Sequence, residues 1–220
     1  MDIFDLAKAR ILAGKGGGGD HSMDDGLIEG TITEYRNDRV TKIGERVFKE
    51  QWQLTSVDFP NVVEVGYEAF YSCECIESMN FPNLKRVGEY AFAGISYVTS
   101  VRFPNVETIE REGFAYMYGL EIADFPKLKY LGGLAFADCP LRALILRGEF
   151  VENIGTCCLQ GSGILDYEGN YTGTGHIYVP RDLVNAYIES TTPNFSQVFR
   201  ALEDYTVDGT ITGELDMSKI

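Results

Sequence analysis

The chain has 220 residues, of which 45% are hydrophobic and 24% are charged, and its formal net charge is −14. This charge excludes nucleic acids and anionic membrane surfaces as expected partners, because their phosphates would be repelled. No apolar run approaches the roughly 18 residues that a membrane-spanning helix needs. The length fits one sizeable domain or one elongated repeat array.

Residues 1–13, MDIFDLAKARILA, are predicted to form a short apolar head helix. Acidic residues stand where a secretory signal would carry basic ones, so we expect no secretory signal peptide. A helix of about 12 residues is marginal alone, so we expect it to self-associate or to dock on a larger particle. Its candidate anchoring residues are Ile3, Phe4, Leu6, Ile11 and Leu12.

Residues 14–26 are rich in glycine, as phosphate-binding loops are. Such a loop needs lysine directly after its second conserved glycine, followed by serine or threonine. Here Lys15 comes before the main glycine run, and Asp20 follows the run, where its charge would oppose a phosphate. The segment is therefore predicted to be a flexible tether.

A repeat of 22 residues dominates the chain from residue 43 onward, and three columns of residues recur in phase. The columns are Phe59, Phe81, Phe103 and Phe125, each followed by proline; Phe48, Phe70, Phe92, Phe114 and Phe136; and Ile43, Val65, Val87, Ile109 and Leu131. Because a unit of this size cannot bury its apolar face alone, the copies are expected to stack into a solenoid with one continuous core.

Each unit contains one predicted strand. Leu54, Val57 and Phe59 are apolar, whereas Ser56 and Asp58 between them are polar, which is the alternation of a strand with one buried face. The proline after each such segment ends the strand without breaking a hydrogen-bond ladder. Strands of successive units would lie parallel and about 4.8 Å apart.

The elements I-G-x-x-A-F and L-x-S-V-x-F-P-N resemble the leucine-rich repeats of the BspA-like surface-antigen type, closely over residues 40–146 and loosely over residues 147–180. The resemblance implies a curved right-handed solenoid at residues 44–180. Its concave side would carry a parallel sheet, and its convex side short helical or irregular turns. The resemblance also associates such repeats with adhesion at the cell surface.

Both ends of the solenoid are expected to carry caps. Residues 27–43 are predicted to form a small β cap that contains a hairpin. Residues 181–205 are predicted to form a helical cap, with Asp182 capping a first helix and a second helix from Phe195 to Tyr205. Residues 206–220 are expected to be a tail or a short hairpin.

The cysteines are expected to be structural. Cys73 and Cys139 share one repeat column, three units or about 14 Å apart, which is too far for a disulfide. Cys73-Glu-Cys75 lacks a second half-site with cysteine or histidine, so we expect no metal and no other cofactor. Cys75, and Cys157 beside Cys158, occupy positions that the repeat constrains less.

The outward columns of the predicted concave sheet are the candidate ligand-binding residues, for a protein or a cell-surface glycan. We expect any affinity to centre on Arg102. Tyrosines on the convex side are equally plausible as contacts or as packing residues. The concave candidates are Ser56, Asp58, Ser78, Asn80, Ser100, Arg102, Ile122 and Asp124.

These features favour a non-enzymatic binding or adhesion module, and no residue is identified as catalytic. An enzyme with paired carboxylates is disfavoured, because Asp58 and Asp124 would lie about 14 Å apart, beyond the roughly 5–9.5 Å of glycosidase pairs. Similar repeat proteins with an apolar head, a polyglycine run and an IYVP tail occur among phage and prophage structural proteins of gut bacteria, which makes a virion-associated role one expectation. A bacterial cell-surface adhesin and a cytoplasmic protein-interaction scaffold remain the alternatives.

Overall fold

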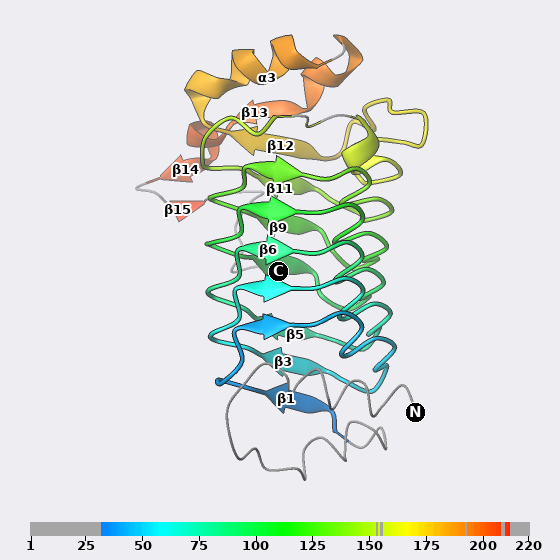
Figure 1. The fold of residues 1–220 in the computed structure, drawn as a ribbon. Helices are drawn as coiled ribbons and strands as arrows, with labels where there is room; N and C mark the ends of the chain where they lie inside the picture. Colours follow the sequence, from blue (N-terminus) through cyan, green and yellow to red (C-terminus); the bar gives the residue numbers. More distant parts are fainter. Residues whose placement is uncertain (1–31, 153, 155, 192, 208–209, 212–220) are drawn as a thin grey trace.

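The computed structural model describes residues 32–152, 154, 156–191, 193–207 and 210–211. These residues form a column of stacked turns, as Figure 1 shows, which confirms the predicted solenoid. From Lys42 to Ile145, each turn runs through one strand of a front sheet, a tight turn, one strand of a rear sheet and a second corner. In the described part of the chain, no helix has the length and hydrophobicity that crossing a membrane requires.

The predicted strands form the rear sheet of Figure 1, and all their pairings are parallel. The register places each predicted column in line, so that Ser56 lies beside Ser78 and Asp58 beside Asn80. We call the outward side of these strands the strand face. The strands are β1 (Glu34–Arg36), β3 (Ser56–Asp58), β5 (Ser78–Asn80), β7 (Ser100–Arg102), β9 (Ile122–Asp124), β11 (Ala143–Ile145), β12 (His176–Val179) and β13 (Phe199–Ala201).

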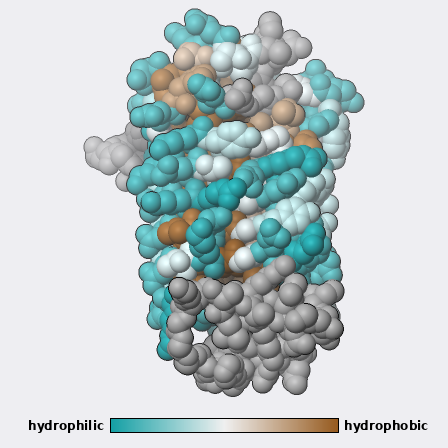
Figure 2. Space-filling model, in the orientation of Figure 1, coloured by the Kyte–Doolittle hydropathy of each residue, from teal (hydrophilic) through white to brown (hydrophobic). Residues whose placement is uncertain are grey.

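A second parallel sheet, which the sequence analysis did not predict, lies on the front of the column. Its outward side is mostly hydrophilic in Figure 2. Ion pairs link residues 22 positions apart on this side, such as Lys42 with Glu64 (2.8 Å) and Glu64 with Arg86 (2.9 Å). The strands are β2 (Lys42–Ile43), β4 (Glu64–Val65), β6 (Arg86–Val87), β8 (Thr108–Ile109) and β10 (Tyr130–Leu131).

The predicted N-terminal hairpin is wrong. Strands β1 and β2 occupy the predicted region, but they do not pair with each other. Instead β1 pairs in parallel with β3, and β2 with β4. Residues 34–43 thus belong to the solenoid and form the first turn among the described residues.

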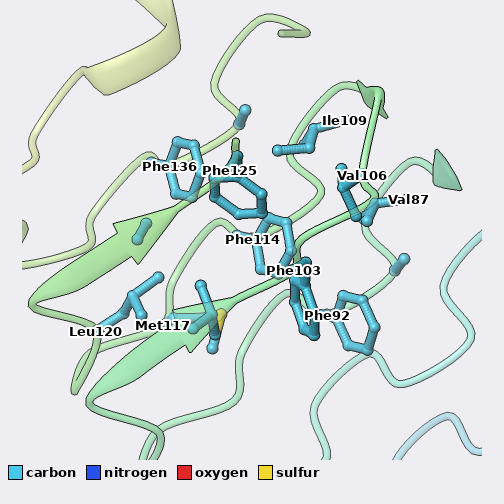
Figure 3. Packing of buried hydrophobic residues seen from close by; sticks show 14 of the residues in the cluster. Val87, Phe92, Phe103, Val106, Ile109, Phe114, Met117, Leu120, Phe125 and Phe136 are labelled. Carbon is cyan, nitrogen blue, oxygen red and sulfur yellow. The ribbon is translucent and has the colours of Figure 1, made fainter. Parts of the chain in front are cut away.

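The core between the two sheets is built from the predicted phenylalanine columns (Figure 3). Phe92 and Phe114 stack with their ring centroids 5.3 Å apart, and Phe114 and Phe136 at 5.5 Å. These three rings are 0% exposed. Because each ring stacks on the ring of the next turn, the 22-residue period directly sets the packing of the core.

A second ladder links successive turns at the corner after the Phe-Pro pairs. The side-chain amide of Asn83 donates to the carbonyl of Pro60 (2.7 Å), and that of Asn105 donates to the carbonyl of Pro82 (2.8 Å). Each bond satisfies a backbone acceptor that the sharp corner leaves without a sheet partner. This explains the asparagine that follows the Phe-Pro pair in the repeat.

The C-terminal end departs in part from the predicted cap. Helix α3 (Val184–Ser190) forms and buries Tyr187 against the core, but its N-cap is Leu183 without a side-chain hydrogen bond, so the predicted Asp182 cap is wrong. The predicted second helix is divided, because β13 extends the rear sheet between two short 3₁₀ segments. The remaining elements are η1 (Thr156–Leu159), η2 (Arg181–Leu183), η3 (Pro193–Val198), η4 (Leu202–Tyr205) and the antiparallel pair β14 (Thr206–Val207) and β15 (Thr210–Ile211).

Candidate binding surfaces

The strand face presents polar residues over its first turns. Ser56 and Ser78 place their hydroxyl oxygens 3.5 Å apart. Asp58 accepts hydrogen bonds from Arg36 (2.6 Å) and from the amide of Asn80 (2.7 Å). Asp58 therefore belongs to a network that spans three turns.

The rear sheet is interrupted between β5 and β7, since no pairing joins these two strands in the described residues. On one side of the interruption the carbonyl of Thr55 accepts a hydrogen bond from the backbone N–H of Ser78. On the other side the carbonyl of Thr99 accepts one from the backbone N–H of Ile122. The equivalent carbonyl of Glu77 receives no bond from Ser100 among the described backbone groups. The front sheet stays continuous at this level through β4, β6 and β8.

A cavity of about 240 Å³ lies at this interruption. Met79 is half-buried there, whereas the equivalent Val57 is 1% exposed. The cavity thus joins an apolar floor to a polar rim. Its lining residues are Glu77, Ser78, Met79, Val98, Ser100, Val101, Arg102 and Phe103.

Arg102 borders this cavity with 64% of its side chain exposed. Its Nε lies 3.5 Å from the carboxylate of Asp124. The carboxylate of Asp124 also accepts bidentate hydrogen bonds from the guanidinium group of Arg147, with distances of 3.0 to 3.2 Å. Asp124 and Asp58 therefore belong to separate ion-pair networks.

Two predicted ligand-binding residues are corrected by the structure. Ile122 and Asp124 are each 1% exposed and cannot present a surface to a ligand. Ile122 belongs to a small apolar cluster over the outward side of the last strands, and Leu202 of η4 completes that cluster. The exposed strand face therefore ends near β7.

The tight turns between the front and rear strands form a third surface, which we call the turn face. It carries a groove of about 450 Å³. Tyr97 and Tyr118 on this side of the molecule are exposed, whereas the four groove tyrosines are half-buried. The groove is lined by Lys49, Tyr67, Glu68, Tyr71, Tyr90, Glu112 and Tyr116.

Glu68 is the ionic centre of one end of the groove. Lys49 and Arg46 bind its carboxylate at 2.6 and 2.7 Å. Burial opposes ionisation of Glu68, but the hydrogen bonds from Lys49, Arg46 and Tyr67 outweigh it and lower the pKa to about 2. The carboxylate is thus ionised at any physiological pH.

Glu112 comes from the same turn as Tyr116, the last turn that lines the groove, and is 3% exposed. It accepts a hydrogen bond from the hydroxyl of Tyr90 (2.8 Å) and pairs with Arg111 (2.6 Å). Burial, and then the hydrogen bond to Glu112, raise the pKa of Tyr90 to about 12. A buried carboxylate is stable only with such partners.

Asp138 extends the acidic side of the groove beyond Tyr116. The hydroxyl of Tyr167 donates a hydrogen bond to its carboxylate. Tyr167 belongs to the irregular segment 161–175, which lies on the same side as the turns in Figure 1. The side-chain amide of Gln160 holds the carbonyl of Tyr167 at 2.8 Å. Sequence reasoning missed this residue, because a loop outside the repeat has no column to place it.

All five cysteines are present as thiols. Cys73 and Cys139 are buried, and burial raises the pKa of each to about 12. Their thiols donate to the carbonyls of Phe48 and Phe114, so they play the same part three turns apart. Cys157 is exposed. The part of the chain that the structure describes contains no cluster of three metal-ligating side chains.

The candidate anchoring residues Ile3, Phe4, Leu6, Ile11 and Leu12 lie outside the described residues, as does the predicted tether at 14–26.

The repeat region of this chain is similar to known proteins. Residues 37–165 match the family model for the BspA type leucine rich repeat region, in six copies. A crystal structure of a leucine-rich repeat protein from Bacteroides ovatus is similar in fold, with a TM-score of 0.51 and 22% sequence identity. The alignment covers 68% of this chain and 45% of that one, so the chain spans less than half of the Bacteroides protein. No curated protein matches the sequence.

Repeats of this family and fold are typically non-enzymatic and form modules for protein interaction and adhesion. The family model covers more than half of the chain, and the solenoid carries its repeat along the whole matched region. The chain therefore belongs to the BspA-type leucine-rich repeat family.

Proposed function

We propose that this chain is a non-enzymatic adhesion module that binds a protein or a surface glycan through the exposed strand face around Arg102. The family supplies the general role, and the residues of the strand face supply the candidate contacts. The proposed contacts are Ser56, Asp58, Ser78, Asn80, Ser100 and Arg102.

The interruption between β5 and β7 is the observation that carries this proposal. Three of the predicted contacts, Ser78, Ser100 and Arg102, line the cavity at that point. Strand edges without a sheet partner offer N–H and C=O groups to a ligand, and a neighbouring pocket adds specificity for a side chain. A ligand group bound here would meet backbone donors, two hydroxyls and a guanidinium around an apolar floor.

The test compares the chain with a variant that carries Arg102→Glu and Asn80→Lys together. Both residues are exposed, so the fold should survive, which a thermal melt would check. Binding is measured on a glycan array and on immobilised surface proteins of bacteria. Loss of the wild-type signals in the variant would support the proposal. Wild-type signals that persist unchanged in a folded variant would contradict it.

Attachment through the N-terminus is the second part of the proposal. An apolar head at residues 1–13 and a glycine-rich tether at 14–26 suit a module that is fixed to a larger body. A phage or prophage particle is the body that we favour, with a bacterial cell surface or a cytoplasmic complex as the alternatives. The head would also account for self-association, should the chain form oligomers.

Deletion of residues 1–22 tests this second part. We expect the deletion to abolish association with induced phage particles, or to change the oligomeric state in solution, while the melting temperature of the solenoid stays the same. Light scattering and mass spectrometry of purified particles provide the readouts. Unchanged oligomeric state together with unchanged particle content would contradict the anchoring role.

A further inference from the structure

The turn face uses one chemical arrangement three times. In each case a basic side chain lies over a tyrosine ring and also pairs with a glutamate, so the cation is bound by a ring face and a carboxylate together. The cation-to-centroid distances are 5.0 Å for Arg46 over Tyr67, 4.9 Å for Lys49 over Tyr71 and 5.8 Å for Arg111 over Tyr90. The paired carboxylates are Glu68, Glu68 and Glu112.

The Tyr116 end of the groove has a tyrosine ring and carboxylates as well, but no basic side chain from the described part of the chain. Glu112 lines the groove together with Tyr116, and the backbone N–H of Tyr116 donates to the carbonyl of Ala137, next to Asp138, at 2.7 Å. After burial, the charges of Glu112 and Asp138 are the main causes of the raised pKa of Tyr116. In the described residues, no basic side chain lies over the ring of Tyr116, and none forms an ion pair with Asp138. The partner of Asp138 is the neutral hydroxyl of Tyr167. Within the described residues, the charge of Asp138 is therefore not neutralised by a basic side chain.

The ring of Tyr90 stands nearly at right angles to two other tyrosine rings of the groove. Tyr71 and Tyr90 make an angle of 79°, and Tyr67 and Tyr90 an angle of 87°, with centroids 6.3 Å apart in both pairs. Each of these three rings has a basic side chain of the chain over it, so tyrosines of this groove already bind compact cations.

We infer that the Tyr116–Asp138–Tyr167 end of the turn-face groove binds a lysine or arginine side chain of a protein partner. The ring of Tyr116 faces the cation, and Asp138 supplies the compensating charge, as Glu68 does for Lys49 inside the chain. The net charge of −14 attracts a basic partner to the chain as a whole. The site lies on a different face from Arg102, so the test of this inference is independent of the test of the strand-face contacts proposed above.

The test uses the full chain and two blocked hexapeptides, Gly-Lys-Ser-Gly-Lys-Ser and its glutamine analogue Gly-Gln-Ser-Gly-Gln-Ser. Calorimetry or fluorescence anisotropy measures both affinities at low salt. We expect the lysine peptide to bind at least about tenfold more tightly than the glutamine peptide.

Two variants locate the site. Asp138→Asn should weaken the lysine peptide about tenfold, and asparagine tolerates the left-handed backbone at this position, where φ is 57°. Tyr116→Leu should weaken it about fivefold, whereas Tyr116→Phe, which keeps the ring face, should stay within about twofold. Asp182→Asn is the matched control, because it removes one exposed charge far from the groove and should also stay within about twofold.

Three results would overturn the inference. The first is equal affinity for the lysine and glutamine peptides. The second is an equal loss of affinity in Asp138→Asn and Asp182→Asn, which would indicate attraction by net charge alone. The third is binding of a neutral oligosaccharide that depends on Asp138 while the lysine peptide does not bind, which would assign the groove to glycans. A melting temperature within a few degrees of the wild type would show that each variant is folded.

Discussion

The hydroxyl of Tyr90 donates a 2.8 Å hydrogen bond to the carboxylate of Glu112, one turn further along the solenoid. Glu112 is 3% exposed, so this bond replaces water for a charged group that the stacking of turns has buried. Arg111 provides the second partner of the same carboxylate. Neighbouring turns of the column are thus joined at the turn face by a buried polar network as well as by stacked phenylalanines.

Replacing Tyr90 with phenylalanine is expected to destabilise the fold by about 1–2 kcal/mol, because the buried Glu112 loses a hydrogen-bond donor while the ring is retained. Urea unfolding followed by circular dichroism measures the loss. The matched control is Tyr97→Phe, since Tyr97 is 63% exposed, and its change should stay within about 0.5 kcal/mol. Equal stabilities of the two variants would contradict a structural role for the Tyr90 hydroxyl.

The ion pairs of Glu68 are expected to make stability depend on acid. Folding lowers the pKa of Glu68 from its ordinary 4.5 to about 2, so the contribution of this residue is complete above pH 4.5 and is lost as the pH falls through about 2. Glu68→Gln should therefore cost about 1–2 kcal/mol at pH 7, and the difference from the wild type should shrink between pH 4.5 and pH 2.

Urea unfolding at pH 7, 4.5 and 2.5 measures this dependence. Glu74→Gln is the control, since Glu74 is exposed and its substitution should have little effect at any of the three pH values. A Glu68→Gln deficit that stays constant down to pH 2.5 would show that the ionised carboxylate is not the source of the stability.

The sequence predicts the solenoid well because the period fixes both packing and register. Phe92 and Phe114 stand 22 positions apart in the sequence, and they stack in the structure. The same spacing aligns Ser56 with Ser78 in the sheet. Any column of the repeat can be placed in this way, including the buried position shared by Cys73 and Cys139.

The features that the sequence does not predict lie where the 22-residue period gives no information. Leu202 lies beyond the repeats, so nothing in the columns predicts that it covers Ile122. Tyr167 comes from a loop, yet it reaches Asp138. The interruption beside Ser100 occurs between repeats of equal length, and it accompanies the absence of a turn hydrogen bond from Val98 to Ile95 in the described residues. Such a local change in the conformation of a turn does not alter the spacing of the repeat columns in the sequence.

Two adjacent glycines are expected to respond in opposite ways to alanine. A Cβ atom on Gly132 would lie 2.5 Å from the backbone of Glu110 and Arg111, whereas a Cβ on Gly133 meets nothing within 4 Å. Gly132→Ala should cost about 1–3 kcal/mol, because the turns must move apart to accommodate the methyl group. Gly133→Ala should be neutral or slightly stabilising, since Glu45, Tyr67, Glu89 and Arg111 occupy its column in other repeats. Thermal melts of the two variants decide this, and similar melting temperatures would contradict the close stacking at Gly132.

The thiols are expected to separate into two classes by their reactivity in the folded protein. Iodoacetamide reacts with thiolates, and burial raises the pKa of Cys73 and Cys139 to about 12, so both should resist alkylation at pH 8. Cys157 is exposed and should be labelled within minutes under the same conditions. Peptide mass spectrometry after a timed reaction gives the extent of labelling at each cysteine. The same reaction in 6 M guanidinium is the control, because all five cysteines should then be labelled. Rapid labelling of Cys73 or Cys139 in the native chain would mean that the turns open locally, and it would contradict the closed core described above.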